Sequence, residues 1–192
     1  MLDLPRNEYN VILCDPPWSW VSYSGKQSAP TKKTVSPYPV MTLEDMKNLP
    51  VPDIADKDCA LIMWVIGSHI EQAINLGKAW GFEFKSDLFT WVKVGKHDPL
   101  VRPIGMGKWT RKQVEQAFIF TRGKPKRKSG GVRQLIEADE VIYEPKREHS
   151  RKPDCQYERI EELLDGPYCE LFSRTTRAGW DAWGNDVGRF EG

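Results

Sequence analysis

The tetrapeptide Asp15-Pro16-Pro17-Trp18 combines three groups that suit the recognition of a planar amine. Two consecutive prolines remove two backbone donors and fix two φ angles, so we expect a rigid, extended turn. In such a turn the Asp15 carboxylate and the Pro16 carbonyl point the same way and accept both hydrogens of an amine. The Trp18 ring supplies a flat surface for stacking. The alternative, that these residues form only a turn, is disfavoured by the buried strand that precedes them.

The elements around this tetrapeptide predict an α/β sandwich with a largely parallel central sheet, because apolar runs alternate with helical patterns. The predicted strands are 10–14, 59–66, 89–94, 116–121 and 168–173, with shorter ones at 140–143 and 180–183. The predicted helices span about 42–48, 68–81 with Ser68 as the N-cap, and 153–166 with Pro153 in the first turn. Residues 19–39 have no hydrophobic period and predict a loop. Since ligands bind beyond the carboxyl ends of strands in open α/β sheets, Asp15 predicts a ligand site there.

Length and composition indicate one domain over residues 1–192. The hydrophobic content is 40% and the charged content 29%, which is ordinary for a globular protein. The longest apolar run, 59–67, is too short to cross a bilayer, and the first residues lack the layout of a signal peptide. We therefore expect a cytoplasmic protein without a membrane partner. The four cysteines form no CxxC pair and predict buried, reduced thiols, and no metal site is expected.

The charge is divided unevenly along the chain. Residues 93–133 hold twelve Lys and Arg residues against Asp98 and Glu115, so this segment carries +10 and the remainder −9. Such one-signed stretches favour a polyanion partner over a solvated loop, and we interpret 93–133 as basic insertions in the domain. Trp109 among these cations suits a splayed strand, although a packed side chain is an equal alternative. The predicted nucleic-acid-binding residues of this stretch are Lys108, Arg111, Lys112, Arg122, Lys124, Lys126, Arg127 and Lys128.

Further motifs extend over the chain in a fixed order. They are Pro37-Tyr38, 61–65 with Gly67, 91–93, 150–154, 170–174 and 179–185. Together with the Asp-Pro-Pro-Trp motif, they resemble the N6-adenine and adenosine methyltransferase family that is typified by the seventy-kilodalton catalytic subunit of the messenger-RNA adenosine methyltransferase. The short DNA adenine methyltransferases of phages and bacteria are the most similar members.

The resemblance implies a Rossmann-like sandwich that depends on S-adenosylmethionine. The Asp-Pro-Pro-Trp motif precedes the cofactor signature, which implies the permuted, beta-class motif order. Asp15, Pro16, Pro17 and Trp18 would be catalytic, and Trp18 and Tyr38 would contact the substrate. The residues that the resemblance assigns to the cofactor are Asp15, Lys152, Glu170, Phe172, Arg174, Asn185 and Asp186.

The expected reaction is direct methyl transfer to the exocyclic amine of a flipped or unpaired adenine. We expect DNA as the substrate, because no accessory RNA-binding module precedes the catalytic elements. An RNA substrate is the first alternative, and an inactive nucleic-acid-binding partner subunit is the second. A small-molecule or protein amine is a third, which the +10 segment disfavours. A homodimer is also expected, since one small subunit has little surface for DNA.

Overall fold

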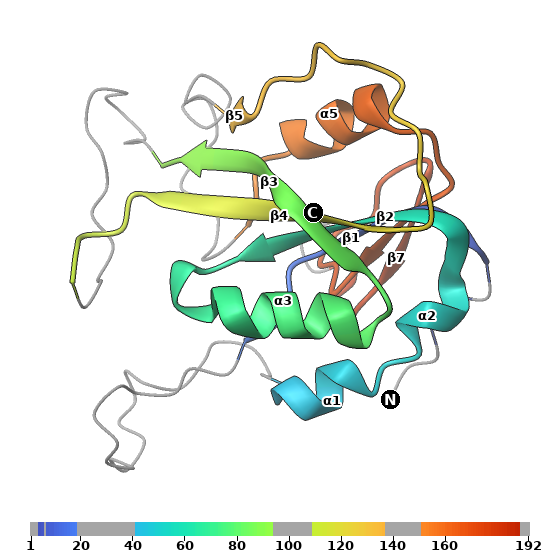
Figure 1. Cartoon of the computed structure of the whole chain (residues 1–192), viewed down its shortest axis with the longest axis horizontal. Helices are drawn as coiled ribbons and strands as arrows, with labels where there is room; N and C mark the ends of the chain where they lie inside the picture. The colour runs from blue at the N-terminus through green and yellow to red at the C-terminus, as the bar shows by residue number, and fades with distance from the viewer. Residues whose placement is uncertain (1–3, 6, 19–40, 94–108, 137–150, 189–192) are drawn as a thin grey trace.

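The computed structural model describes residues 4–5, 7–18, 41–93, 109–136 and 151–188. Its centre is a seven-stranded sheet in the order β5-β3-β4-β2-β1-β6-β7 (Figure 1). The pairing registers make every strand parallel to the others except β4, which runs antiparallel to β2 and β3. The strands are β1 (Tyr9–Cys14), β2 (Ala55–Val65), β3 (Glu83–Val92), β4 (Val114–Arg122), β5 (Leu135–Ile136), β6 (Tyr168–Leu171) and β7 (Trp180–Trp183).

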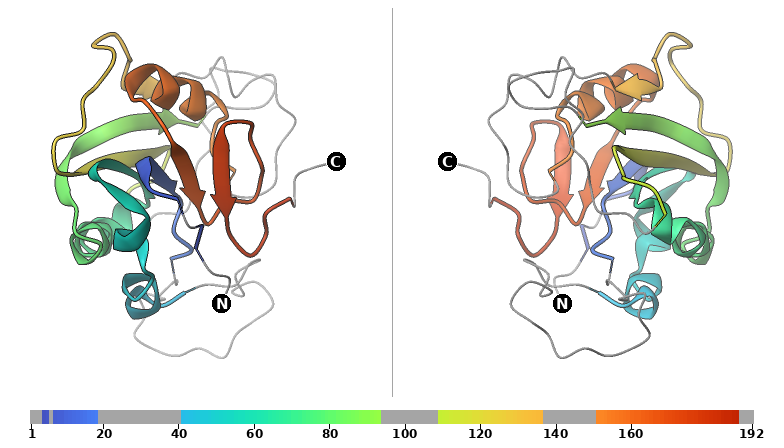
Figure 2. Two further views of the ribbon diagram at one scale, coloured as in Figure 1. Left: turned by 90° about the vertical axis from the view of Figure 1, so that its right-hand side faces the viewer. Right: turned by 90° about the vertical axis from the view of Figure 1, so that its left-hand side faces the viewer.

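Helices cover both faces of this sheet (Figures 1 and 2). One face carries α1 (Leu43–Lys47), α2 (Val51–Ile54) and α3 (Ile70–Ala79), and the other carries α5 (Cys155–Leu163). Side chains alternate along each strand, so the sheet has two apolar cores. Ile12, Leu61 and Phe120 pack beneath the first face, and Val11 and Ile62 pack beneath α5. The predicted sandwich and its largely parallel sheet are confirmed.

Several element boundaries differ from the predictions. β3 begins at Glu83, whereas the sequence predicted a start at residue 89. The prediction missed the first half of the strand because that half is mostly exposed and has no apolar run. Ser68 was wrongly predicted as an N-cap, since a 3₁₀ turn over Gly67–His69 precedes α3 and the Ser68 hydroxyl contacts His69 Nδ1 at 3.0 Å. The short α2 and β5 were not predicted. The predicted strand 140–143 and the predicted loop 19–39 lie outside the described residues.

The antiparallel direction of β4 follows from its connection to β3. Parallel neighbours need a long crossover, usually a helix, and the sequence between residues 94 and 116 carries no helical pattern. β4 therefore begins at the end of the sheet where the other strands finish. The registers place Cys14 beside both Met63 and Leu171, Leu171 beside Trp183, and Gln116 beside Val65.

This edge consequently gathers residues from distant parts of the sequence. Asp15 follows β1, Phe172 follows β6, Asn185 lies two residues beyond β7, and Glu115 lies at the start of β4. Among the described residues, no helix is long and apolar enough to cross a membrane.

Candidate active site

A cleft lies at this carboxyl edge of the sheet. Most of its walls come from residues that the sequence analysis selected. The lining residues are Asp15, Pro16, Pro17, Trp18, Val65, Ile66, Glu115, Lys152, Phe172, Ser173, Arg174, Asn185 and Asp186.

Backbone hydrogen bonds hold the Asp15-Pro16-Pro17-Trp18 turn at the mouth of β1. The Trp18 N–H donates to the Pro16 carbonyl at 2.8 Å, and the Met41 N–H donates to the Pro17 carbonyl at 3.1 Å. The Pro16 carbonyl keeps a second lone pair for a ligand. The Trp18 ring is only 5% exposed and lies 5.6 Å from the His69 ring, so it packs as part of the first core rather than standing open to a base.

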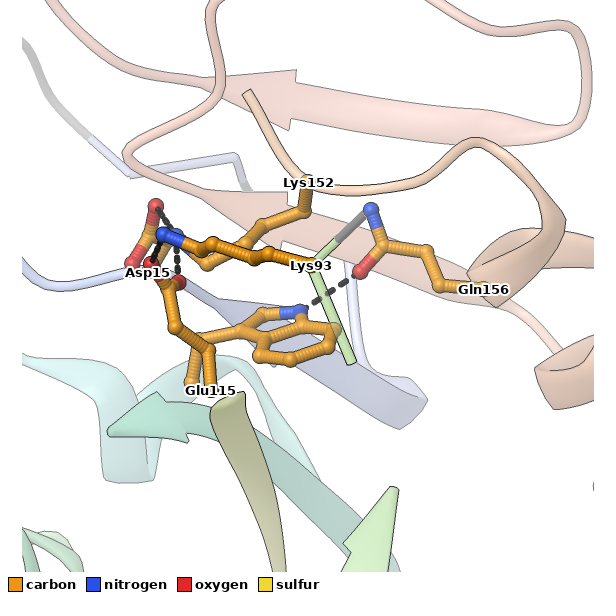
Figure 3. A network of polar contacts seen from close by, with 6 residues as sticks. Asp15, Lys93, Glu115, Lys152 and Gln156 are labelled. Carbon is orange, nitrogen blue, oxygen red and sulfur yellow. Dashed lines mark hydrogen bonds and ion pairs between the residues drawn. The ribbon is translucent and has the colours of Figure 1, made fainter. Parts of the chain in front are cut away.

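Four charged side chains of alternating sign form a continuous chain in the cleft (Figure 3). Lys152 Nζ lies 2.6 Å from Asp15 Oδ2 and 3.3 Å from Glu115 Oε2. Lys93 Nζ pairs with the other Glu115 oxygen, Oε1. The Lys152 ammonium also lies 5.6 Å from the centre of the Trp64 ring, whose indole N–H is held by Gln156. The Lys152 side chain is 7% exposed, so its charge is compensated inside the protein.

The pKa values of Lys152 and Glu115, the two central members of this row of charges, keep both side chains ionised. Burial opposes the charge on Lys152, but the carboxylates of Asp15 and Glu115 outweigh it and raise the Lys152 pKa above its usual value. Burial likewise opposes ionisation of Glu115, but Lys152 and Lys93 outweigh it and lower the Glu115 pKa. At neutral pH an ammonium therefore faces the Asp15 carboxylate directly.

Glu170 lies beside this cleft, in a smaller adjoining pocket that also contains Asp15 and Lys152. Its Oε2 accepts hydrogen bonds from the Tyr157 hydroxyl at 3.0 Å and from the Ser173 hydroxyl at 2.7 Å. Burial raises the Glu170 pKa despite these two donors. One of its carboxylate oxygens is thus committed to fixing the turn after β6.

The turn after β6 is shaped by strain and by close packing. Phe172 has φ +62°, a left-handed conformation that non-glycine residues rarely adopt and that concentrates at functional sites. A Cβ on Gly184 would lie 2.4 Å from the Ser173 carbonyl oxygen, so the ends of β6 and β7 touch through backbone alone. This arrangement brings Phe172 and Arg174 from one strand and Asn185 from the next into one wall of the cleft.

The predicted phosphate-binding loop after β4 lies elsewhere. Arg122 pairs in the sheet with Cys59, near the amino end of β2, so the loop begins at the sheet edge opposite Asp15 (Figure 1). The Arg122 guanidinium donates to the Pro52 carbonyl at 2.7 Å and thereby joins β4 to α2. Lys128 pairs with Asp165 at 3.0 Å. The side chains of Lys124, Lys126 and Arg127 are exposed.

The structure thus divides the predicted substrate residues between two ends of the sheet. Arg111 and Lys112 directly precede β4 and belong to the cleft end, whereas 122–128 does not. Tyr38 and Lys108 lie outside the described residues.

Sequence reasoning missed Glu115, Val65, Ile66 and Ser173 as lining residues. Glu115 carried a signal, because it is one of two acids in a segment with twelve bases and it opens an apolar strand. An acid among so many cations, at the start of a buried strand, indicates an internal ion pair. The other three residues have no chemical signature in the sequence.

A seven-stranded α/β sheet with a charged ligand cleft at its carboxyl edge is consistent with a methyltransferase fold. The chain belongs to the MT-A70 family, since the model of that family matches residues 9–186. This is a family of N6-adenine methyltransferases, and the family-level prediction from the sequence is confirmed.

Three relatives illustrate the range of that similarity. The type II methyltransferase M.MunI of Mycoplasma sp. is 33% identical, over 96% of this chain and 80% of that protein. The N(6)-adenosine-methyltransferase MT-A70-like protein of Arabidopsis thaliana is 28% identical, over 93% of this chain and 24% of its own length. The human N(6)-adenine-specific methyltransferase METTL4 is 26% identical, over 97% of this chain and 39% of its own length.

Proposed function

We propose that this protein transfers a methyl group from S-adenosylmethionine to the N6 amine of adenine in DNA. The observation that carries the proposal is the Asp15 carboxylate at the carboxyl end of β1, held 2.6 Å from a buried ammonium in a cleft that Phe172 and Asn185 also line. The Asp-Pro-Pro-Trp turn lies within the segment that the family model matches.

The side chains of the cleft fit S-adenosylmethionine by their chemistry. Lys152 and Arg174 are cations that suit its carboxylate, and Asn185 and Asp186 suit the hydroxyls of its ribose. Phe172 offers an apolar face for its adenine ring. When bound, the cofactor supplies a methyl group on a positively charged sulfur.

The chain's own residues would orient and activate the acceptor amine. The adenine amine is a weak nucleophile, because its lone pair is delocalised into the ring. Asp15 and the Pro16 carbonyl accept the two amine hydrogens and favour a more tetrahedral nitrogen, whose lone pair then points at the methyl group. Lys152 pairs with Asp15 and fixes its position, and Glu115 balances the charge of Lys152. After transfer, the methylated ammonium is acidic enough to lose its proton to water.

DNA is proposed over RNA because the match to the type II methyltransferase of Mycoplasma sp. covers more of that relative than the matches to the Arabidopsis, human and Pyricularia proteins cover of theirs. It combines 33% identity with 80% of that protein's length. The N6-methyladenosine RNA methyltransferase MTA1 of Pyricularia oryzae matches at 28% identity over 48% of its length, which keeps RNA as the second candidate. An inactive partner subunit is disfavoured, because the Asp15 turn and the cofactor-side residues share one cleft.

Three further predictions belong to this proposal. The Asp15 turn precedes the cofactor-side residues in the chain, which supports the permuted motif order. One sheet contains strands from Tyr9 to Trp183, which supports a single methyltransferase domain over 1–192. The homodimer stays a prediction that sedimentation analysis would check.

The test is an incubation with S-adenosylmethionine that carries a labelled methyl group, on DNA and RNA side by side, followed by digestion to nucleosides. We expect label in N6-methyldeoxyadenosine. Label only in N6-methyladenosine would replace DNA by RNA, and label in methylcytosine would refute the proposed chemistry.

The Asp15→Ala variant provides the residue-level check. Methyl transfer should fall by roughly 10³-fold or more, because the amine loses its charged acceptor, whereas cofactor binding should fall only modestly. Equilibrium binding of S-adenosylmethionine and single-turnover transfer separate the two effects. Normal turnover in this variant would contradict the role assigned to Asp15.

A further inference from the structure

Trp109 is the one described tryptophan whose side chain lies in solvent. It is 89% exposed, whereas the other six described tryptophans are at most 8% exposed. An indole ring is one of the largest apolar side chains, so an exposed one offers a wide flat face on which another molecule can stack.

The position of Trp109 ties it to the cleft. β4 begins five residues later, and its residue Val114 pairs with Val92 at the carboxyl end of β3. Glu115, which lines the cleft, is six residues from Trp109, so the two lie at most roughly 20 Å apart. Figure 1 shows the segment that leads into β4 projecting beyond the carboxyl ends of β2 and β3.

The neighbours of Trp109 indicate the chemistry of the molecule that covers it. Arg111 and Lys112 follow after Thr110, Arg111 is exposed, and no acid lies between Trp109 and Val114. An apolar protein partner would be matched by a wider apolar surface. An aromatic ring beside two cations instead fits a stacked base and its flanking phosphates.

We propose that Trp109 stacks inside the DNA duplex next to the target adenine and fills the space that the extruded base leaves. This inference rests on the proposed function, since N6 transfer from a duplex requires the adenine to leave the stack. Extrusion breaks the stacking on both sides of the base. A ring that enters the gap restores part of this stacking, and Arg111 and Lys112 are then placed against the backbone.

Catalysis provides the first test. Trp109→Ala, Trp109→Phe and wild type are compared on two duplexes that carry a target site, which is first located by sequencing of DNA that the wild type has methylated. One duplex pairs the target adenine with thymine, and the other mismatches it, which lowers the cost of extrusion. We expect Trp109→Ala to lose roughly 5- to 150-fold in kcat/KM on the paired duplex, the range that base–aromatic stacking spans, and clearly less on the mismatched one. Trp109→Phe should retain most activity.

Binding provides a second test that does not depend on activity. Addition of a random-sequence 30-base-pair duplex should quench the fluorescence of the exposed indole, and Trp109→Phe should lose that quenching. Leu135→Ala serves as the control for truncation of an exposed apolar side chain, and it should behave as wild type in both assays.

The outcomes separate this inference from the proposed function. Equal kcat/KM for Trp109→Ala and wild type on the paired duplex would overturn the inference, and so would an equal loss on both duplexes. A wild-type protein that methylates no DNA would refute the proposed function. In that case, absence of quenching by the duplex would also refute the role of Trp109.

Discussion

At the residue scale, the chemistry of the cleft depends on how Lys152 is shared between two carboxylates. Its ammonium lies nearer to Asp15 than to Glu115, at 2.6 Å against 3.3 Å. Both pairs are largely removed from water, so removal of one partner leaves an imbalance that solvent does not screen. Glu115 therefore acts through Lys152 on the catalytic carboxylate and is a positioning residue.

Glu115→Gln tests this role. With Glu115 neutralised, Lys152 pairs with Asp15 alone and weakens that carboxylate as an acceptor for the amine. We expect kcat to fall roughly 10-fold, in line with one charged hydrogen bond, with a smaller change in the KM for the cofactor. Steady-state kinetics with varied S-adenosylmethionine measure both constants, and an unchanged kcat would exclude the role.

The same variant predicts a pH dependence of stability. The folded-state pKa of Glu115 is lowered by Lys152 and Lys93 against the effect of burial, so its stabilisation is present above its unfolded pKa. That stabilisation is lost as the pH falls through the lowered folded value. Glu115→Gln should cost about 1.5–3 kcal/mol of unfolding free energy at pH 7, and the difference from wild type should vanish in acid.

Urea unfolding between pH 3 and pH 8 measures this difference. Glu44→Gln is the control, because Glu44 forms an exposed pair with Lys47 that is worth well under 1 kcal/mol. A difference between wild type and Glu115→Gln that grows toward acid would contradict the assigned ion pairs.

At the element scale, α3 rests on the sheet through a glycine. A Cβ on Gly77 would lie 2.6 Å from the ring of Phe120, which is fully buried. Gly77→Ala gains about 1 kcal/mol of helix propensity but costs about 1–3 kcal/mol of overpacking. We expect a net destabilisation, measured by thermal unfolding. Asn75→Ala, on the exposed side of α3, should be neutral or stabilising, and the same effect from both substitutions would argue against close packing at Gly77.

The basic loop after β4 belongs to the same scale. Lys124, Lys126 and Arg127 are exposed at the end of the sheet opposite the cleft, so any phosphates they contact lie far from the target base. Triple replacement by Ala should weaken DNA binding and reduce the slope of log K against log salt by up to about 2.7, while kcat stays unchanged.

Titrations at several salt concentrations measure that slope. Lys47→Ala combined with Lys85→Ala is the control, because these two lysines form exposed ion pairs elsewhere on the surface. An unchanged slope in the triple variant would show that the loop is solvated and does not contact DNA phosphates.

At the scale of the whole molecule, all four cysteines are free and buried, as the sequence predicted. Burial raises the pKa of Cys59 and of Cys169 to about 12, so their thiolates are scarce at neutral pH. Iodoacetamide should therefore leave the native protein unmodified and label four thiols after unfolding in guanidinium. Mass spectrometry counts the adducts, and rapid labelling of one native cysteine would show local opening that the structure lacks.

Much of the fold was predictable because its signals are local. Apolar runs and turn residues located β1, β2, β6 and β7 to within a few positions, since the local pattern of apolar residues indicates both backbone conformation and burial. The first half of β3 was missed, because its side chains are mostly exposed and show no pattern. In the cleft, the sequence predicted residues with an evident chemical role, such as Asp15 and Lys152. It missed residues such as Val65 and Ser173, which line the cleft only because the fold places them there.

The sequence by itself determined the alternation of strands and helices, the Asp-Pro-Pro-Trp turn and the membership of a family. Only the tertiary structure decided that Lys152 meets Asp15, 137 residues away, and that Lys152 also pairs with Glu115. It also decided that 122–128 lies at the end of the sheet opposite the cleft, while 109–113 leads into β4 at the cleft end. The reason is that strand order and the reversed direction of β4 arise from packing between distant segments, which no local pattern encodes.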